Sequence, residues 1–82
     1  MKPVCLCELQ EGAVARFHEA RLDDTACNEL RSLGLTRFSL IRLCKAGEPC
    51  IVQVRSTRIG LARSVACAIF VIPELPIKPL AL

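Results

Sequence analysis

The segment from Leu30 to Val71 limits the fold most, because its hydrophobic periodicity changes in a fixed order. It opens with L-R-S-L-G-L, which is typical of a short helix that ends at Gly34. Three stretches of alternating apolar and polar residues follow, with the period of two that half-buried strands show. A stretch long enough for one helical turn and a final apolar stretch complete the segment. This order predicts a small, mainly β domain.

The residues before this segment predict a first strand and the start of the helix. Residues 13–20 alternate, with Ala15 and Phe17 on one face, and Asp23, Asp24 and Thr25 are all suitable helix N-caps. We expect the inward positions to form one aliphatic core. These positions are Leu30, Leu33, Ile41, Val52, Val54, Leu61, Ile69 and Val71.

The expected architecture is a small five-stranded SH3-like barrel. One short α-helix follows the first strand, and a one-turn helix precedes the last strand. We assign the barrel to residues 1–72 and a proline-rich, extended or loosely docked tail to residues 73–82. A barrel of this size is too small to enclose a substrate, so its outer surface is the place to look for function.

The sequence lacks the patterns that indicate two classes of function, catalysis and nucleic-acid binding. The phosphate-binding loop, the nucleophile elbow and a pair of cooperating carboxylates are all missing, so neither catalysis nor a cofactor is expected. The net charge is +3, the basic residues are spread along the chain, and three Phe are the only aromatic residues. This pattern does not favour nucleic-acid binding, which needs a dense basic surface and stacking aromatics.

The distribution of apolar residues argues against a membrane span. The longest unbroken apolar run is Val65 to Ile72, far shorter than the roughly 20 residues that a spanning helix needs. The N-terminal residues do not form a secretory signal, because Glu8 interrupts a short apolar stretch. We therefore expect a cytoplasmic protein without direct membrane insertion.

The six cysteines fit mainly a role as small apolar side chains, since a cytoplasmic location is reducing. Two alternatives stay open. Cys5 and Cys7, with His18 or with a cysteine of a second copy, could hold zinc or ferrous iron, although paired C-x-x-C motifs are missing. Disulfides are the other alternative.

Several apolar residues fall on the outward side of the predicted strands and turns. An outward Phe beside aliphatic residues, with arginines around it, is typical of a protein-binding surface. The predicted surface consists of Leu35, Phe38, Leu40 and Ile51, with Arg37, Arg42 and Arg55 as its rim. The alternative is that barrel curvature or the C-terminal tail covers these side chains.

The order of these residues resembles the FeoA family and the related SH3-like domain of some iron-dependent repressors. The matching residues are Leu6, Leu9 and Gly12, then Leu30, Leu33, Gly34 and Leu35, and finally Pro49, Val52, Val54, Arg55, Arg58, Leu61, Ala66, Ile69 and Val71. The chain departs from the family pattern at Glu29, at Arg37-Phe38 and at Ser56, which lie at predicted turns and on the predicted surface.

This resemblance implies a cytoplasmic accessory protein of bacterial ferrous iron uptake that interacts with the membrane transporter FeoB. It does not extend to DNA reading, because the helix-turn-helix of the repressors is missing. A small metal-binding regulatory module is the alternative function, and weak self-association is left open.

Overall fold

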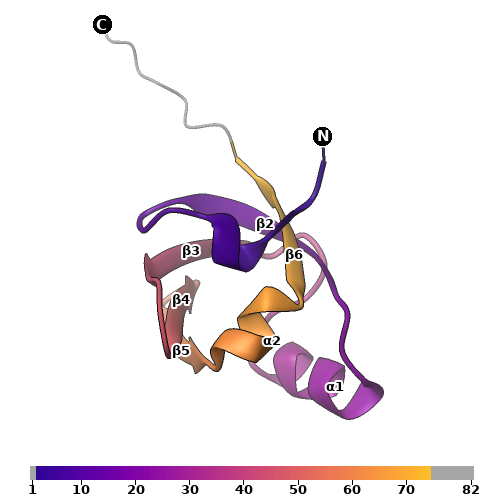
Figure 1. Cartoon of the computed structure of the whole chain (residues 1–82). Coiled ribbons are helices and arrows are strands. Elements are labelled where there is room, and N and C mark those ends of the chain that lie inside the picture. Colours follow the sequence, from indigo (N-terminus) through magenta and orange to yellow (C-terminus); the bar gives the residue numbers. More distant parts are fainter. Residues whose placement is uncertain (1, 75–82) are drawn as a thin grey trace, which may run out of the picture.

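The structure is a computed structural model that describes residues 2–74. Its strands are β1 (Val4–Cys5), β2 (Val14–Ala20), β3 (Leu40–Lys45), β4 (Cys50–Val54), β5 (Thr57–Leu61) and β6 (Ile69–Pro73). Its helices are the short 3-10 helix η1 (Leu6–Glu8), α1 (Asp24–Ser32) and α2 (Arg63–Cys67). The strands form one antiparallel sheet in the order β1-β6-β2-β3-β4-β5, and this sheet curls into a small barrel (Figure 1).

The predicted fold class is confirmed, with one strand more than expected. A short helix follows the first long strand, and a one-turn helix precedes the last strand. The additional strand is β1, in which Val4 pairs with Val71 and Cys5 pairs with Phe70. A strand of two residues is too short to produce an alternating pattern, which is why the sequence did not reveal it.

The ends of α1 are fixed by local hydrogen bonds. The carboxylate of Asp23 accepts from the Ala26 N–H at 2.8 Å and caps the N-terminus. At the C-terminus, Gly34 has a φ of +98°, the left-handed conformation that glycine adopts without strain. The Leu35 N–H donates to the Leu30 carbonyl at 2.9 Å, and the Gly34 N–H donates to the Arg31 carbonyl at 3.0 Å. These two bonds form a Schellman motif, which turns the chain back toward the barrel.

The aliphatic core contains every predicted inward residue except Leu33, for which the prediction was wrong. The Leu33 side chain is 46% exposed, whereas that of Leu35 is only 1% exposed. The Schellman motif explains the exchange, because Leu33 is the C-cap residue of α1 and the chain reverses after Gly34. Leu35 therefore fills the core position that the helical spacing had assigned to Leu33.

The chain beyond β6 continues along β2 for one more residue. The Glu74 N–H donates to the Val14 carbonyl at 3.0 Å, and β6 itself includes Pro73, the first residue of the predicted tail. The remaining predicted tail, residues 75–82, lies outside the described residues. No helix between residues 2 and 74 combines the length and the apolar character that crossing a bilayer requires.

Candidate interaction groove and cysteine cluster

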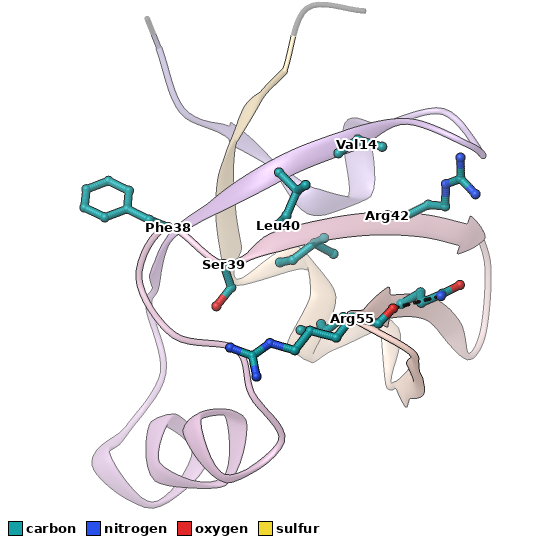
Figure 2. A pocket seen from close by; sticks show the side chains of 9 residues that line it. Val14, Phe38, Ser39, Leu40, Arg42 and Arg55 are labelled. Atoms are coloured by element: carbon teal, nitrogen blue, oxygen red, sulfur yellow. Dashed lines mark hydrogen bonds between the residues drawn. The ribbon is translucent and has the colours of Figure 1, made fainter.

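A groove of about 590 Å³ lies on the outer surface over β2, β3 and β4 (Figure 2). It is lined by Val14, Phe38, Ser39, Leu40, Ile41, Arg42, Gln53, Val54 and Arg55. In Figure 2 the ring of Phe38 projects from one end of the groove, Arg42 lies at the opposite end, and Arg55 lies along one edge. We call this surface the groove below.

Four of the seven residues predicted for the partner surface line the groove, namely Phe38, Leu40, Arg42 and Arg55. Phe38 is 57% exposed and Leu40 is 47% exposed, so neither side chain is covered by the described residues. The groove thus combines exposed apolar side chains with two guanidinium groups, and this composition suits contact with a protein.

The other three predicted residues lie elsewhere. Arg37 is exposed beside the groove, and its Cζ lies 5.1 Å from the centroid of the Phe38 ring. Ile51 is half-buried in β4 and is not among the residues that line the groove. The placement of Leu35 on the outer surface was wrong, because the Schellman motif buries its side chain in the core.

The backbone of the groove is strained at two positions. Phe38 has a φ of 69° and Arg55 has a φ of 59°. They are the two non-glycine residues with a positive φ in the described part of the chain, and both line the groove. A side chain with a Cβ pays about 1–2 kcal/mol in this region of backbone space. Strain of this kind persists where the surrounding structure enforces it, and it concentrates at functional sites.

Hydrogen bonds from β2 hold Phe38 in this conformation. The Phe38 N–H donates to the Phe17 carbonyl at 2.8 Å, and the Phe17 N–H donates to the Ser39 carbonyl at 2.8 Å. Nη1 of Arg16 donates to the Phe38 carbonyl at 3.2 Å, while its Nε forms an ion pair with Glu74 at 2.7 Å. These bonds fix the backbone at Phe38 and so the point from which its exposed side chain projects.

Arg55 occupies the first position of the two-residue turn between β4 and β5. Its carbonyl accepts a hydrogen bond from Nε2 of Gln53 at 2.9 Å. A positive φ at the first position alone is the pattern of hairpin turns that favour glycine there. The chain thus places a long cation at a position where glycine would be unstrained.

Five groove residues were not among those predicted for the partner surface, namely Val14, Ser39, Ile41, Gln53 and Val54. Two of them, Ile41 and Val54, were predicted as core positions and are buried, so they form the floor of the groove. Gln53 has the same outward parity in β4 as Ile51, which was predicted. A polar residue on a strand surface is common, however, so it does not indicate a binding site. Val14 enters the groove because β2 pairs with β3, where Val14 lies opposite Arg42. Predicting that Val14 lies in the groove would require knowledge of the register between two strands that are separated by a helix in the sequence.

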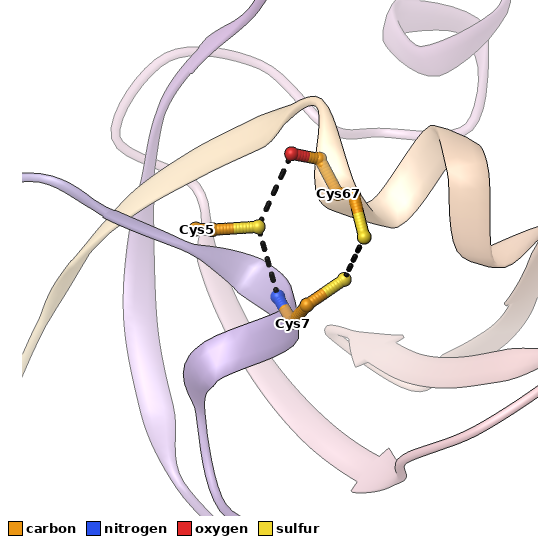
Figure 3. Close-up of side chains that lie close together, drawn as sticks. All are labelled: Cys5, Cys7 and Cys67. Carbon is orange, nitrogen blue, oxygen red and sulfur yellow. Dashed lines mark hydrogen bonds between the residues drawn. The ribbon is translucent and has the colours of Figure 1, made fainter.

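A second feature is a cluster of three cysteine sulfurs, which we call the thiol cluster. The Sγ atoms of Cys5, Cys7 and Cys67 all lie within 4.8 Å of one another (Figure 3). Cys5 ends β1, Cys7 belongs to η1, and Cys67 is the last residue of α2. Cys5 and Cys7 are half-buried and Cys67 is exposed, so the cluster opens to solvent on one side.

Hydrogen bonds tie the three side chains together. The Sγ atoms of Cys7 and Cys67 are 2.7 Å apart, and the Cys7 N–H donates to Sγ of Cys5 at 3.4 Å. Sγ of Cys5 in turn donates to the Cys67 carbonyl at 3.1 Å. Desolvation, together with hydrogen bonds to Cys67 and Cys5, raises the pKa of Cys7 to about 12. In the absence of a cation, the Cys7 thiol is therefore protonated at neutral pH.

The structure differs from the predicted metal-binding set in two respects. His18 is not part of the thiol cluster, and it lies half-buried at a β-bulge between Phe17 and Glu19. Cys67 joins Cys5 and Cys7, although no sequence spacing connected it with them. Its nearness follows from the fold, since β1 pairs with β6 and α2 directly precedes β6.

Comparison with protein families gives one clear assignment. Residues 4–73 match the model of the FeoA domain. This range includes every strand and helix of the structure and most of the chain. The chain therefore belongs to the FeoA family, as its sequence pattern predicted, and this family is associated with ferrous iron transport. No curated protein matches the chain.

Solved structures agree with this assignment. FeoA of Stenotrophomonas maltophilia, solved in complex with zinc and described as a prokaryotic SH3-domain protein, is 28% identical with a TM-score of 0.71. The alignment covers 87% of this chain and 89% of that one. FeoA of Chlorobium tepidum is 21% identical with a TM-score of 0.83, over 96% of this chain and 80% of that one.

A larger protein shares the same fold in one part of its length. IdeR of T. acidophilum is 21% identical with a TM-score of 0.82, over 90% of this chain but only 35% of that one. The fold is thus common to FeoA proteins and to a portion of a larger protein.

Proposed function

We propose that this chain is an accessory protein of ferrous iron uptake that binds the cytoplasmic side of the FeoB transporter through its groove. Membership of the FeoA family supports the link to iron uptake. The S. maltophilia relative is described as a candidate activating factor of ferrous iron transport, which agrees with an accessory role. The observation that carries the proposal is the strained, exposed and partly apolar groove.

The composition of the groove indicates the kind of surface that it would bind. Phe38 and Leu40 are exposed apolar side chains that could enter an apolar recess of a partner. Arg42 and Arg55 would then lie at the rim, where guanidinium groups pair with carboxylates. The expected contact on the transporter is therefore an apolar recess with acidic residues around it.

The backbone conformation supports the same assignment. Glycine at position 55 and asparagine at position 38 would relieve strain, yet the chain places Arg and Phe at these positions. Both side chains are exposed, so neither contributes to the core in return. Large side chains at strained and exposed positions are explained if they contact a partner.

A matched pair of substitutions tests this function. Phe38→Asp replaces an exposed ring of the proposed contact by a charge, and aspartate tolerates a positive φ better than phenylalanine does. We expect Phe38→Asp to weaken binding to detergent-solubilised FeoB by about 30-fold or more, as for a hot-spot residue. Biolayer interferometry with immobilised transporter measures this change.

Leu33→Asp is the control, because Leu33 is similarly exposed but caps the C-terminus of α1 outside the groove. We expect its affinity for FeoB to stay within about twofold of the unmodified protein, since surface changes outside a contact are nearly neutral. Circular dichroism should show that both variants are folded. Equal binding by the folded Phe38→Asp variant and the unmodified protein would refute the proposal.

A further inference from the structure

We propose that Cys5, Cys7 and Cys67 form a binding site for one thiophilic divalent metal ion, with Zn²⁺ as the preferred ion. This site is separate from the groove and does not depend on the function proposed above. The three sulfurs come from two segments that the fold brings together, β1 with η1 and the end of α2 (Figure 3).

The geometry is close to that of a metal site. Tetrahedral Zn²⁺ with Zn–S bonds of about 2.3 Å places its sulfur ligands about 3.8 Å apart. Here the Sγ atoms of Cys7 and Cys67 are 2.7 Å apart, and all three sulfurs lie within 4.8 Å of one another. The required separation falls inside this range, so each sulfur needs to move by only about 1 Å relative to its neighbours to receive the ion.

The donor set determines which ions are favoured. The cluster supplies three sulfur atoms, and no His, Asp or Glu of residues 2–74 joins them. Thiolates prefer Zn²⁺ over Fe²⁺, both because they are soft ligands and because Zn²⁺ binds more strongly in the general affinity order. The site would therefore discriminate against ferrous iron.

One hydrogen bond within the cluster favours a bound thiolate at Cys5. The Cys7 N–H donates to Sγ of Cys5 at 3.4 Å, and this bond strengthens when the sulfur becomes an anion. Arg63, the first residue of α2, lines a hollow together with Cys7, and its carbonyl lies 4.0 Å from Sγ of Cys7. Because Cys67 is exposed, the fourth position of the ion faces solvent, where a water molecule completes the tetrahedron.

Binding involves no change of oxidation state. Three S–H bonds break, three Zn–S bonds form, and three protons pass to solvent for each ion bound. The ion would link the N-terminal segment to α2 and so stabilise the folded state over the unfolded one.

A titration of the reduced full-length chain without oxygen tests the site. Co²⁺ is the spectroscopic probe, because thiolate ligands give it an intense charge-transfer band in the near ultraviolet. We expect one Co²⁺ per chain, displacement by Zn²⁺, and at least about tenfold weaker binding of Fe²⁺. Saturating Zn²⁺ should raise Tm by about 5 °C or more.

Substitutions identify the ligands. Cys5→Ser, Cys7→Ser and Cys67→Ser should each weaken Zn²⁺ binding by about 100-fold and abolish the rise in Tm, since one of three bonds is lost. Cys27→Ser is the matched control. Cys27 is also half-buried, but its Sγ contacts the Leu22 carbonyl at 3.5 Å, away from the cluster. The affinity of Cys27→Ser for Zn²⁺ should stay within about twofold of that of the unmodified protein.

Three results would overturn the proposal. The first is no binding of Zn²⁺ or Co²⁺ by the folded, reduced protein. The second is unchanged affinity in Cys67→Ser, which is the variant least able to disturb folding because Cys67 is exposed. The third is one ion for every two chains with dimer formation in analytical ultracentrifugation, which would mean that two copies share the ion.

Discussion

The groove and the thiol cluster are built in opposite ways. The groove residues lie mostly in two short stretches, 38–42 and 53–55, and its strained backbone holds their side chains toward solvent. The thiol cluster joins residues that are 60 and 62 positions apart in sequence, and it needs no positive φ. Most groove residues are therefore close together in sequence, whereas the cysteines of the thiol cluster meet only through contacts between distant segments.

This difference separates two kinds of function. An exposed apolar surface with cations at its rim suits reversible contact with a protein, where shape and charge decide the partner. Three neighbouring sulfur atoms suit a small cation, and the softness and number of these ligands decide which ion binds. If the two regions are independent, a substitution in one should leave the other unchanged.

The largest effect is expected in the core, at a leucine that the sequence analysis placed on the surface. Leu35→Ala should lower the free energy of unfolding by about 3 kcal/mol, because it leaves a cavity behind a fully buried side chain. Leu33→Ala should change it by less than about 0.5 kcal/mol, since Leu33 is exposed. Urea denaturation measures both. Similar costs for the two variants would mean that Leu35 is not the residue that fills the core.

A smaller effect of opposite sign is expected at Arg55. Arg55→Gly should stabilise the fold by about 1 kcal/mol, because glycine followed by Ser56 suits the β4–β5 turn and removes the strain. The same variant should bind FeoB more weakly, since it loses a rim cation. A lower stability of Arg55→Gly in urea denaturation would show that the positive φ at this position carries no strain.

The smallest effect concerns the charge of the rim. Arg42→Gln should weaken binding to FeoB by about threefold at low salt, and the difference should shrink as the salt concentration rises. Arg58→Gln is the control, because Arg58 is an exposed arginine of β5 outside the groove. Association rates at several ionic strengths measure this effect. An equal loss in Arg58→Gln would indicate a general effect of net charge.

The sequence predicted the barrel because alternation marks each long strand and Gly34 marks the end of α1. It failed at Leu33 and Leu35, where helical spacing assigned the core position to the wrong leucine. The hydrogen bond from the Leu35 N–H to the Leu30 carbonyl decides which leucine turns inward. Such a reversal depends on the motif after the helix, which spacing within the helix does not capture.

The candidate sites were predictable to different degrees. Leu40 could be placed outside because parity within β3 orients its side chain. Phe38 is also exposed, but it lies in the turn before β3 with a positive φ, so strand parity does not explain its orientation. Cys67 could not be joined to Cys5 and Cys7, because their nearness depends on pairing of the two-residue strand β1 with β6. A pattern of two residues is too short to be read before the register of the sheet is known.

The central claim is that the groove binds the transporter while the thiol cluster binds the metal ion. One experiment tests it directly: the affinities of Leu40→Asp, Cys67→Ser and Leu33→Asp for FeoB and for Zn²⁺. We predict that Leu40→Asp loses only the transporter, that Cys67→Ser loses only the ion, and that Leu33→Asp retains both. Loss of transporter binding in metal-free Cys67→Ser, or an equal loss in Leu33→Asp, would contradict this division of the molecule.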